Sequence, residues 1–559
     1  MPRLGRLLCC GWRKKSQKDD GIYHPLLPDD ERQAINDLLQ FFRTSVDIGQ
    51  PTEEQMRSLL YVSYSERVDL QRTAALCFAE ISDRMRAEAK MEMVEALVSL
   101  LQVHDVEVQQ ASSLALSNLA LKGPACNKRT IMQAGALRPL ISLLNSSNED
   151  VQCNACGCIT TLATTEVNKR NVVEHGALRP LLQLARSQDP RVQRNAAGAI
   201  LNITHIDTNR DEMVRSNALP VLLDLLKSPD RDVQYYTAAA LSNIAVNEHH
   251  RAAIVAINNG SVLPDLLQLL TNSSNKVKSQ ACLALRNLAS DDSNQEQIVQ
   301  LGGLNHLLPL LHSQDQETCT AAVAAVRNIS IHDGNAIHIV KGNFLPELAT
   351  LLTRERWPEA QCHAAGTLRN LAAEKQTAAL LQSGVVDTAM DLLDNSRCPD
   401  AVLAEATAAL AILCASEDAL TDIMARRGKP LCRALLVRAK DSQDAEVRYN
   451  CIGAIGHIAM DVSTHQVLLS CQPSLLQLLN GLMLQSEPAF VHLSLWVLQQ
   501  LCKGGADTMQ AVRISVVYQQ LQKVAHGSEH RKEIVDLATS IINSLSVESQ
   551  KSPSPTSPA

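Results

Sequence analysis

The chain has 559 residues and a formal net charge of −7, with 45% hydrophobic, 3% aromatic and 20% charged residues. Since the charge is negative and no long basic stripe is present, we expect no nucleic-acid partner. A core with so few aromatic side chains must be built mainly from Leu, Ala, Val and Ile. Most of the sixteen cysteines stand singly within helical apolar patterns, which is typical of reduced core thiols in a cytosolic protein.

Residues 1–28 are expected to form a basic leader that carries a lipid anchor. The first eighteen residues hold six Arg or Lys, no acid, and two leucines that run into Cys9 and Cys10. Adjacent cysteines in such a setting are typical of S-palmitoylation, and two acyl chains give a stable membrane anchor. The apolar patch is too short for a membrane span or a signal-peptide core. The alternative is an unmodified, disordered leader; Pro2 excludes N-myristoylation.

Residues 29–55 are expected to form an N-terminal amphipathic helix that leads into or covers the first repeat. An aspartate at the cap and acids in the first turn mark its start. Its apolar residues recur at helical spacing: Ala34, Ile35, Leu38, Leu39 and Phe42.

Residues 56–546 repeat one sequence pattern at intervals near forty residues. The clearest copies are LRNLASDDSNQ, VRNISIHDGN and LRNLAAEKQ, which contain the pairs Arg286 and Asn287, Arg327 and Asn328, and Arg369 and Asn370. Upstream copies place Asn118, Asn202 and Asn243 at the same position, while Thr161 replaces the asparagine in one copy. Self-similarity at this period is typical of armadillo or HEAT solenoids.

Each full unit is punctuated in the same way. A glycine or asparagine precedes a helix with proline in its first turn, an acidic loop follows, and a longer helix then ends in the asparagine motif. The residues that precede the proline-bearing helices are Gly135, Gly176, Asn217, Gly260 and Gly342. A short helix followed by two longer ones is the armadillo unit. With degenerate end copies at Glu80 and Gln500, we predict an all-α, right-handed superhelical armadillo solenoid of about eleven repeats.

Residues 547–559 are polar and proline-rich, so we expect a disordered Ser/Pro tail. No motif for catalysis is present: there is no phosphate-binding glycine loop, Gly-x-Ser-x-Gly elbow or His-Glu-x-x-His helix. Cys153, Cys156 and Cys158 lie in one predicted core helix without a second ligand pair, so we expect no metal and no cofactor. We therefore expect a protein that is not an enzyme.

The asparagines and arginines of the repeats are the candidate partner-binding residues. The third helix of an armadillo unit lines the concave groove, where an asparagine amide can both donate to and accept from the backbone of an extended peptide. Arginine pairs with carboxylates, carbonyls or phosphates. We therefore expect a groove for an acidic or carbonyl-rich segment, formed by Arg286, Asn287, Arg327, Asn328, Arg369, Asn370, Asn243, Asn202 and Asn118.

Two other readings of these residues are open. In the first, each asparagine bonds the backbone of the neighbouring repeat and each arginine pairs with an acid such as Asp291 or Asp333. In the second, the groove would bind lysine-rich signals, as importin-alpha does with tryptophans four residues before each asparagine. That position holds no aromatic residue before Trp496, so a receptor for basic signals is disfavoured: Leu114, Gly198, Ala239, Leu283, Ala324 and Gly366 occupy it.

Nearly the whole chain resembles the vacuolar protein 8 family of armadillo adaptors. The resemblance is carried by DDERQAI, VQCNACGCITTLAT, VQRNAAGAILNITH, DVQYYTAAALSNIAV and the three Arg-Asn motifs. It implies a peripheral protein, lipid-anchored to the cytosolic face of the vacuole or lysosome membrane. Members of the family carry an N-terminal myristoyl group and palmitoylated cysteines, and their groove arginines correspond to those of the Arg-Asn motifs. Because Pro2 replaces the myristoylated glycine, anchoring here would depend on Cys9 and Cys10 alone.

The resemblance also implies three kinds of protein partner. These are a myosin cargo adaptor for vacuole inheritance, an autophagy-initiation factor for cytoplasm-to-vacuole targeting, and a nuclear-envelope tether that forms nucleus-vacuole contacts. A part in vacuole fusion is implied as well, and self-association of the solenoid is left open. The alternative hypothesis is a soluble adaptor of the beta-catenin kind that works in adhesion or signalling. Fractionation with and without Cys9 and Cys10 separates the two hypotheses.

Overall fold

The computed structural model of the protein describes residues 29–44, 48–272, 274–374, 376–485, 487–527 and 531–547. The predicted lipidation sites Cys9 and Cys10, the rest of the leader and the tail after Val547 lie outside the described residues. Within those ranges the regular structure is helical and contains no strand, so the all-α prediction is confirmed. The chain divides into two compact units, residues 1–284 and 285–559.

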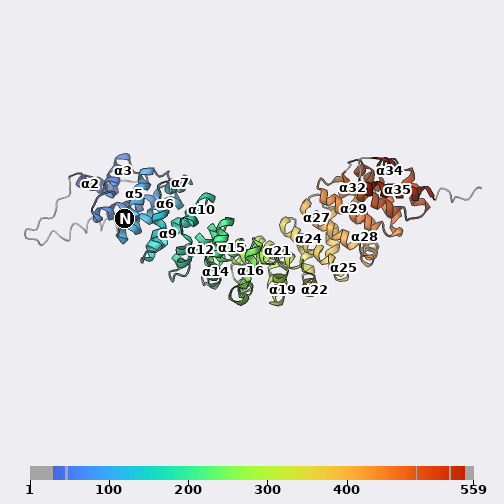
Figure 1. Cartoon of the computed structure of the whole chain (residues 1–559), viewed down its shortest axis with the longest axis horizontal. Helices are drawn as coiled ribbons and strands as arrows, with labels where there is room; N and C mark the ends of the chain where they lie inside the picture. Colours follow the sequence, from blue (N-terminus) through green and yellow to red (C-terminus); the bar gives the residue numbers. More distant parts are fainter. Residues whose placement is uncertain are drawn as a thin grey trace, which may run out of the picture. The chain divides into compact units, whose positions relative to one another are not determined.

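Unit 1 is built around a row of long third helices. Each contacts the next in chain order, as Figure 1 shows for α6, α9, α12 and α15. Their apolar residues at threes and fours are buried, and each helix ends in the asparagine position of the repeat. The third helices are α4 (Val68–Arg84), α6 (Val106–Lys122), α9 (Glu149–Leu162), α12 (Pro190–Ile203) and α15 (Arg231–Ile244); α18 (Asn275–Leu288) contains the boundary between the units.

The shorter helices of unit 1 precede these third helices. The first helices of the repeats are α7 (Cys126–Gln133), α10 (Glu166–Glu174), α13 (Asp207–Arg215) and α16 (Glu248–Ala256), whereas α3 (Glu53–Ser63) packs on α4 as the second helices pack on theirs. The second helices are α5 (Met91–Leu101), α8 (Leu137–Leu143), α11 (Leu178–Leu184), α14 (Leu219–Leu226) and α17 (Val262–Leu269), with the 3-10 turn η1 (Ile257–Gly260) before the last. Second helices pack on third helices, for example α8 on α9 and α11 on α12.

Unit 2 continues the pattern in the described residues. Its third helices are α21 (Gln316–Ile329), α24 (Pro358–Ala373), α27 (Asp400–Cys414), α29 (Ala445–Ile458) and α32 (Pro488–Leu501), and each contacts the next. The first helices are α19 (Asp292–Gln300), α22 (Ala336–Lys341), α25 (Thr377–Gln382), α30 (His465–Ser470) and α33 (Ala506–Ile514), with η2 (Asp333–Asn335) before α22 and η3 (Val462–Thr464) before α30. The second helices are α20 (Gly303–Leu311), α23 (Leu345–Leu352), α26 (Val385–Asp394), α31 (Leu475–Leu484) and α34 (Val516–His526).

Two helices of unit 2 depart from the three-helix unit. The helix α28 (Glu417–Asp441) joins a first and a second helix and kinks at Arg427, where φ is −142° and ψ is 27°. The helix α35 (Lys532–Val547) packs on α32 and α34 and so adds one more layer after the eleven predicted third helices. The predicted armadillo solenoid is thus confirmed, with this additional helix at its C-terminal end.

The turns before the second helices have a left-handed backbone, as the glycine pattern indicates. Gly135 and Gly176 have φ of 77° and 84°, and Asn217 has φ of 58°. In the turn before α23, Asn343 and not Gly342 has the positive φ, at 63°. The helix α22 ends with Asn343 N–H bonded to Val340 O, so the left-handed position falls one residue later.

The helix predicted within residues 29–55 is seen as α2 (Asp29–Thr44) and contacts α3. Its buried face holds Ala34, Ile35, Leu38 and Phe41, whereas Phe42 is only half-buried. The face is therefore rotated slightly from the predicted one, so that Phe41 and not Phe42 covers the first repeat.

Among the described helices, none alone is long and apolar enough to cross a bilayer. The bent pair Val462–Ser470 and Leu475–Leu484 is long and apolar enough only when the two helices are taken together.

Candidate functional site

Third helices of unit 2 place the predicted arginines at corresponding positions. Arg286 lies in the last turn of α18, Arg327 in that of α21, and Arg369 near the end of α24. All three side chains are half-buried. We call the surface formed by Arg286, Arg327, Arg369 and Glu405 the arginine face.

Glu405 on α27 pairs with two of the three arginines. Its Oε1 lies 2.5 Å from Nη2 of Arg327, and its Oε2 lies 2.7 Å from Nη1 of Arg369. The side chains of Arg327, Arg369 and Glu405 are 24%, 34% and 13% exposed, so the carboxylate lies deepest and the guanidinium groups lie closer to solvent. For these two arginines the acid is therefore neither Asp291 nor Asp333, which had been the suggested partners.

Arg327 reaches Glu405 by passing across the helix that lies between them. At Gly366 of α24, an added Cβ would stand 2.5 Å from Nε and 2.7 Å from Cζ of Arg327. Such a distance is shorter than any real Cβ contact, so the extended path of Arg327 requires the absence of a side chain at residue 366. Gly366, four residues before Asn370, thus leaves the space that Arg327 needs in the arginine face. The sequence pattern did not indicate this role.

Arg286 differs from the other two arginines. In the part of the chain that the structure describes, its guanidinium makes no ion pair or hydrogen bond. The pKa of the His363 imidazole on α24 is lowered to about 4. Burial is the largest cause, and the positive charges of Arg327 and Arg286 add to it. His363 is therefore neutral near pH 7, and Arg286 keeps an unneutralised positive charge at one end of the arginine face.

The asparagines use their amide donors to join successive repeats. In unit 2, Nδ2 of Asn328 donates to Arg286 O at 2.8 Å, and Nδ2 of Asn370 donates to Arg327 O at 3.2 Å and to Ser330 Oγ at 3.0 Å. Asn287 holds the same position in α18. Donors in unit 1 reach the preceding repeat too: Asn202 to Thr160 O at 2.9 Å, Asn243 to Thr204 Oγ1 at 3.0 Å and Asn118 to Ser82 Oγ at 3.4 Å.

These bonds limit what the asparagines can offer to a partner. One N–H of the Asn328 amide is used within the stack, as the alternative interpretation expected, and both N–H groups of Asn370 are used in this way. Because an asparagine amide has two N–H groups, Asn328 keeps one N–H and its Oδ1 for a partner, whereas Asn370 keeps Oδ1. The arginines offer more donors, because one guanidinium carries five N–H groups.

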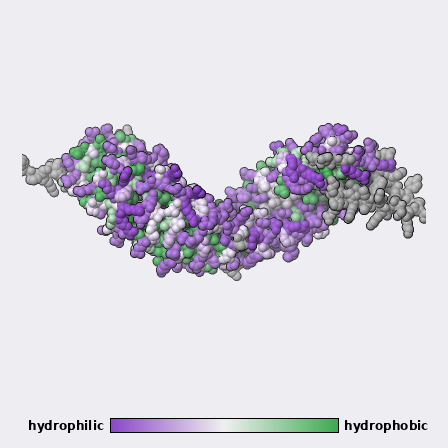
Figure 2. Space-filling model, turned by 180° about the vertical axis from the view of Figure 1, so that it is seen from behind, coloured by the Kyte–Doolittle hydropathy of each residue, from purple (hydrophilic) through white to green (hydrophobic). Residues whose placement is uncertain are grey.

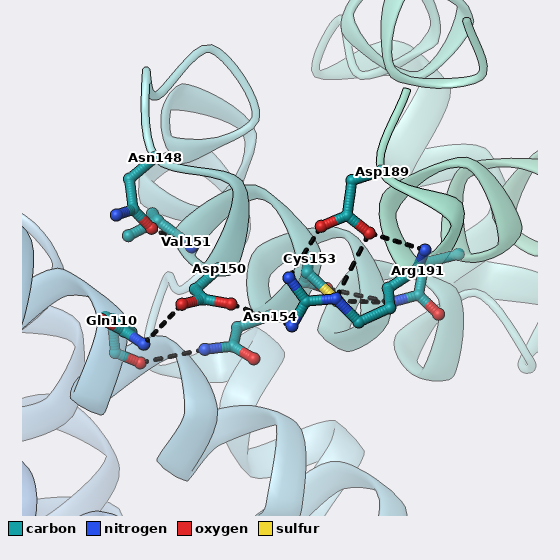
Figure 3. Close-up of polar contacts among 9 residues, drawn as sticks. Gln110, Asn148, Asp150, Val151, Cys153, Asn154, Asp189 and Arg191 are labelled. Atoms are coloured by element: carbon teal, nitrogen blue, oxygen red, sulfur yellow. Dashed lines mark hydrogen bonds and ion pairs between the residues drawn. The ribbon is translucent and has the colours of Figure 1, made fainter. Parts of the chain in front are cut away.

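A second set of polar side chains joins repeats in unit 1 (Figure 3). Asn154 donates to Gln110 O at 3.1 Å, Gln110 Nε2 donates to Asp150 at 3.1 Å, and Arg191 pairs with the same carboxylate at 2.9 Å. Asn195 likewise donates to Cys153 O at 3.0 Å. Many of the polar residues on the third helices thus hold the stack together, so a polar residue in the repeat is not by itself evidence of a binding site.

Two cysteines of α9 and the aromatic ring of Trp496 lie within the helical stack. Cys156 and Cys158 are buried in α9, and burial raises the pKa of the Cys158 thiol to about 12, so it stays protonated. Trp496 packs onto the preceding repeat, where an added Cβ at Gly456 would meet its ring at 2.0 Å, and it stacks edge-on with His457 at 5.1 Å. The ring of Trp496 is therefore used within the stack.

The surface is mostly hydrophilic on the side shown in Figure 2. Exposed apolar residues of the described chain, such as Leu121, Val246, Ile331 and Met460, recur three residues after the asparagine position. Single exposed apolar side chains are common in folded proteins.

The repeats match those of known proteins. Residues 125–164, 165–205, 207–246 and 291–331 match the Armadillo/beta-catenin-like repeat. The chain is 41% identical to Vacuolar protein 8 of Schizosaccharomyces pombe over 514 residues, which cover 91% of each protein. It is also 41% identical to Vacuolar protein 8 of Candida albicans over 512 residues, which cover 90% of this chain and 86% of the relative.

Solved structures agree on the fold. An engineered protein of 31% identity aligns with a TM-score of 0.65 and covers 74% of this chain and 99% of its own. A structure from a study of the cadherin and beta-catenin interaction aligns with a TM-score of 0.66 at 18% identity, over 87% of this chain and 99% of its own. At 18% identity the second likeness concerns the fold alone.

Proposed function

Because the chain belongs to the vacuolar protein 8 family of armadillo-repeat proteins, we propose that it is a scaffold of the vacuole or lysosome membrane that captures extended acidic segments of protein partners. The arginine face is the capture site. Arg286 is the first anchor for a partner carboxylate, and the solvent-facing N–H groups of Arg327 and Arg369 continue the site along α21 and α24. The scaffold is a binding protein, and no catalytic step is assigned to it.

The observation that carries this proposal is the uncompensated charge of the arginine face. The arginine face holds three guanidinium groups and one carboxylate, which pairs with Arg327 and Arg369 and not with Arg286, so two positive charges are in excess in a protein whose overall net charge is −7. A local positive site on a negatively charged protein attracts acidic segments and repels basic ones. The half-buried position of the arginines also strengthens each charge-assisted hydrogen bond relative to one made fully in water.

The finer parts of the proposal come from the family. We propose a peripheral protein on the cytosolic face of the membrane, held there by palmitoyl groups on Cys9 and Cys10. Its proposed partners are a myosin cargo adaptor, an autophagy-initiation factor and a nuclear-envelope tether, and its proposed processes are vacuole inheritance, cytoplasm-to-vacuole targeting, nucleus-vacuole contacts and vacuole fusion. Because these partners would compete for one arginine face, partner exchange would follow from their relative affinities and local concentrations.

Two experiments test the two halves of the proposal. For anchoring, we expect the full chain in the membrane fraction and the Cys9→Ser, Cys10→Ser variant in the cytosol; a wild-type chain found wholly in the cytosol contradicts the anchor. For capture, quantitative pull-downs compare wild type with the triple variant Arg286→Ala, Arg327→Ala, Arg369→Ala. A matched control removes three exposed arginines elsewhere, Arg138, Arg179 and Arg231. Loss of the same acidic-segment proteins from both triple variants, or from neither, contradicts a capture role.

A further inference from the structure

Glu405 lies where the proposed partner would place its own carboxylate. We propose that Glu405 is a built-in counter-ion that competes with an incoming acidic segment for Arg327 and Arg369 and thereby limits the affinity of the arginine face. The inference rests on the proposed function and adds to it a residue that determines specificity. It predicts which of the three arginines a partner meets first.

The sequence around Glu405 indicates that its carboxylate is paired rather than exposed to solvent. Between residues 401 and 414 it is the one charged side chain, in a helix that is otherwise Ala, Leu, Val, Ile, Thr and Cys. A carboxylate that is only 13% exposed in such surroundings is unfavourable unless it is paired. It lies two turns before Ile412, as His363 lies two turns before Asn370, so the register of the repeat brings it onto the arginine face.

The pairing is close but incomplete. Oε1 accepts a hydrogen bond from Nη2 of Arg327 at 2.5 Å. Oε2 lies 2.7 Å from Nη1 of Arg369, yet it is buried and receives no properly directed hydrogen bond. A carboxylate with one unsatisfied oxygen is held mainly by charge, so a partner carboxylate with better geometry can take over the Arg369 guanidinium.

The same arrangement leaves Arg286 as the available anchor. Arg286 makes no ion pair with any residue that the structure describes, while Arg327 and Arg369 must share their charge between Glu405 and a partner. A partner carboxylate near Arg327 or Arg369 is also repelled by Glu405. Removing the Glu405 charge without changing its shape should therefore strengthen capture and give Arg327 and Arg369 more of the binding energy.

A positioning role for Glu405 predicts the opposite change in affinity when its carboxylate is removed. If the carboxylate served mainly to hold Arg327 and Arg369 extended toward the partner, its removal would let both side chains relax and would weaken capture. The direction of the change in affinity therefore distinguishes competition from positioning.

The experiment uses the full chain and a fluorescein-labelled dodecapeptide of alternating glutamate and glycine as the probe, titrated by fluorescence anisotropy at low salt. We expect Glu405→Gln to bind the probe about three- to tenfold more tightly than wild type. Glu405→Asp, which keeps the negative charge, should bind the probe less tightly than Glu405→Gln. Glu174→Gln is the control, since it removes one exposed negative charge on α10 of unit 1 and should leave the affinity unchanged.

A double-mutant cycle completes the test. Arg327→Ala should weaken probe binding more in the Glu405→Gln background than in wild type. In that background no carboxylate at residue 405 competes with the probe for the Arg327 guanidinium. With Glu405 unchanged, the Arg286→Ala variant should lose more affinity for the probe than the Arg327→Ala variant. This comparison does not depend on the folding of any Glu405 variant. Circular dichroism spectra are compared to verify that each variant is folded.

The results separate the two proposals. If wild type binds the probe in a way that depends on Arg286 but Glu405→Gln binds equally or more weakly, the counter-ion inference is overturned and the capture site stands. If neither wild type nor Glu405→Gln binds the probe, the preference for acidic segments is overturned, and the inference with it.

Discussion

Asn328 donates a hydrogen bond to the carbonyl oxygen of Arg286 at 2.8 Å, so the asparagine of one repeat holds the backbone of the arginine in the repeat before it. Asn370 holds Arg327 in the same way, at 3.2 Å. The two halves of the Arg-Asn motif therefore have separate tasks. The asparagine fixes the spacing of the third helices, and the arginine presents charge at that spacing.

Replacing Asn370 by Ala should weaken the stack more than it weakens binding. The change removes the bonds to Arg327 O and Ser330 Oγ, so we expect a loss of about 1–2 kcal/mol in stability and faster amide exchange in α24. Urea unfolding and hydrogen exchange by mass spectrometry measure these effects. Thr161→Ala is the matched control, since the hydroxyl of Thr161 at the same repeat position bonds Gly157 O within its own helix. Equal effects of the two substitutions would contradict the assigned role of Asn370.

Gly366→Ala should weaken binding of the acidic probe with little change in the stability of the fold. Alanine gains about 1 kcal/mol in helix propensity but must displace the side chain of Arg327, which costs a comparable amount. We therefore expect the free energy of unfolding to change by less than about 1 kcal/mol, while acidic-probe binding falls to the level of Arg327→Ala.

The control for this prediction is Gly453→Ala in α29, where an added Cβ meets nothing within 4 Å. This variant should gain stability and bind the probe like wild type. If Gly366→Ala also bound the probe like wild type, the path of Arg327 across α24 would not matter for capture.

The burial of His363 makes stability depend on pH. Its pKa of about 4 is below the unfolded value of 6.5, so the folded chain binds fewer protons than the unfolded chain. The stabilisation is fully present above pH 6.5 and is lost as the pH falls toward 4, by up to about 3 kcal/mol. His363→Gln should flatten this part of the urea-midpoint profile, whereas the exposed His492→Gln should not. Parallel profiles for wild type and His363→Gln would refute the assignment.

The sequence allowed most of the fold to be predicted, because the repeat unit carries its own local signals. The asparagine series located the ends of the third helices, and Gly135, Gly176 and Asn217 marked the turns before the second helices. The glycine pattern did not indicate which residue of the turn before α23 is left-handed, and in the structure it is Asn343 and not Gly342.

The candidate site was only partly predictable, since its partners lie far apart in the chain. Glu405 is separated from Arg327 by 78 residues and belongs to a repeat that has lost the asparagine motif. One available signal was a single charged residue in an apolar helix, which must find a partner. The glycine at residue 366 was a weaker signal, because Gly157, Gly198 and Gly453 occupy the same position in other repeats.

The most direct test of the arginine face is a titration of purified protein with the labelled acidic dodecapeptide at two salt concentrations. We expect the variant Arg286→Ala, Arg327→Ala, Arg369→Ala to lose at least about tenfold in affinity and most of the salt dependence, while its helical content stays the same. The control that removes Arg138, Arg179 and Arg231 should bind as wild type does. Equal probe affinity for wild type and the arginine-face variant would contradict the account.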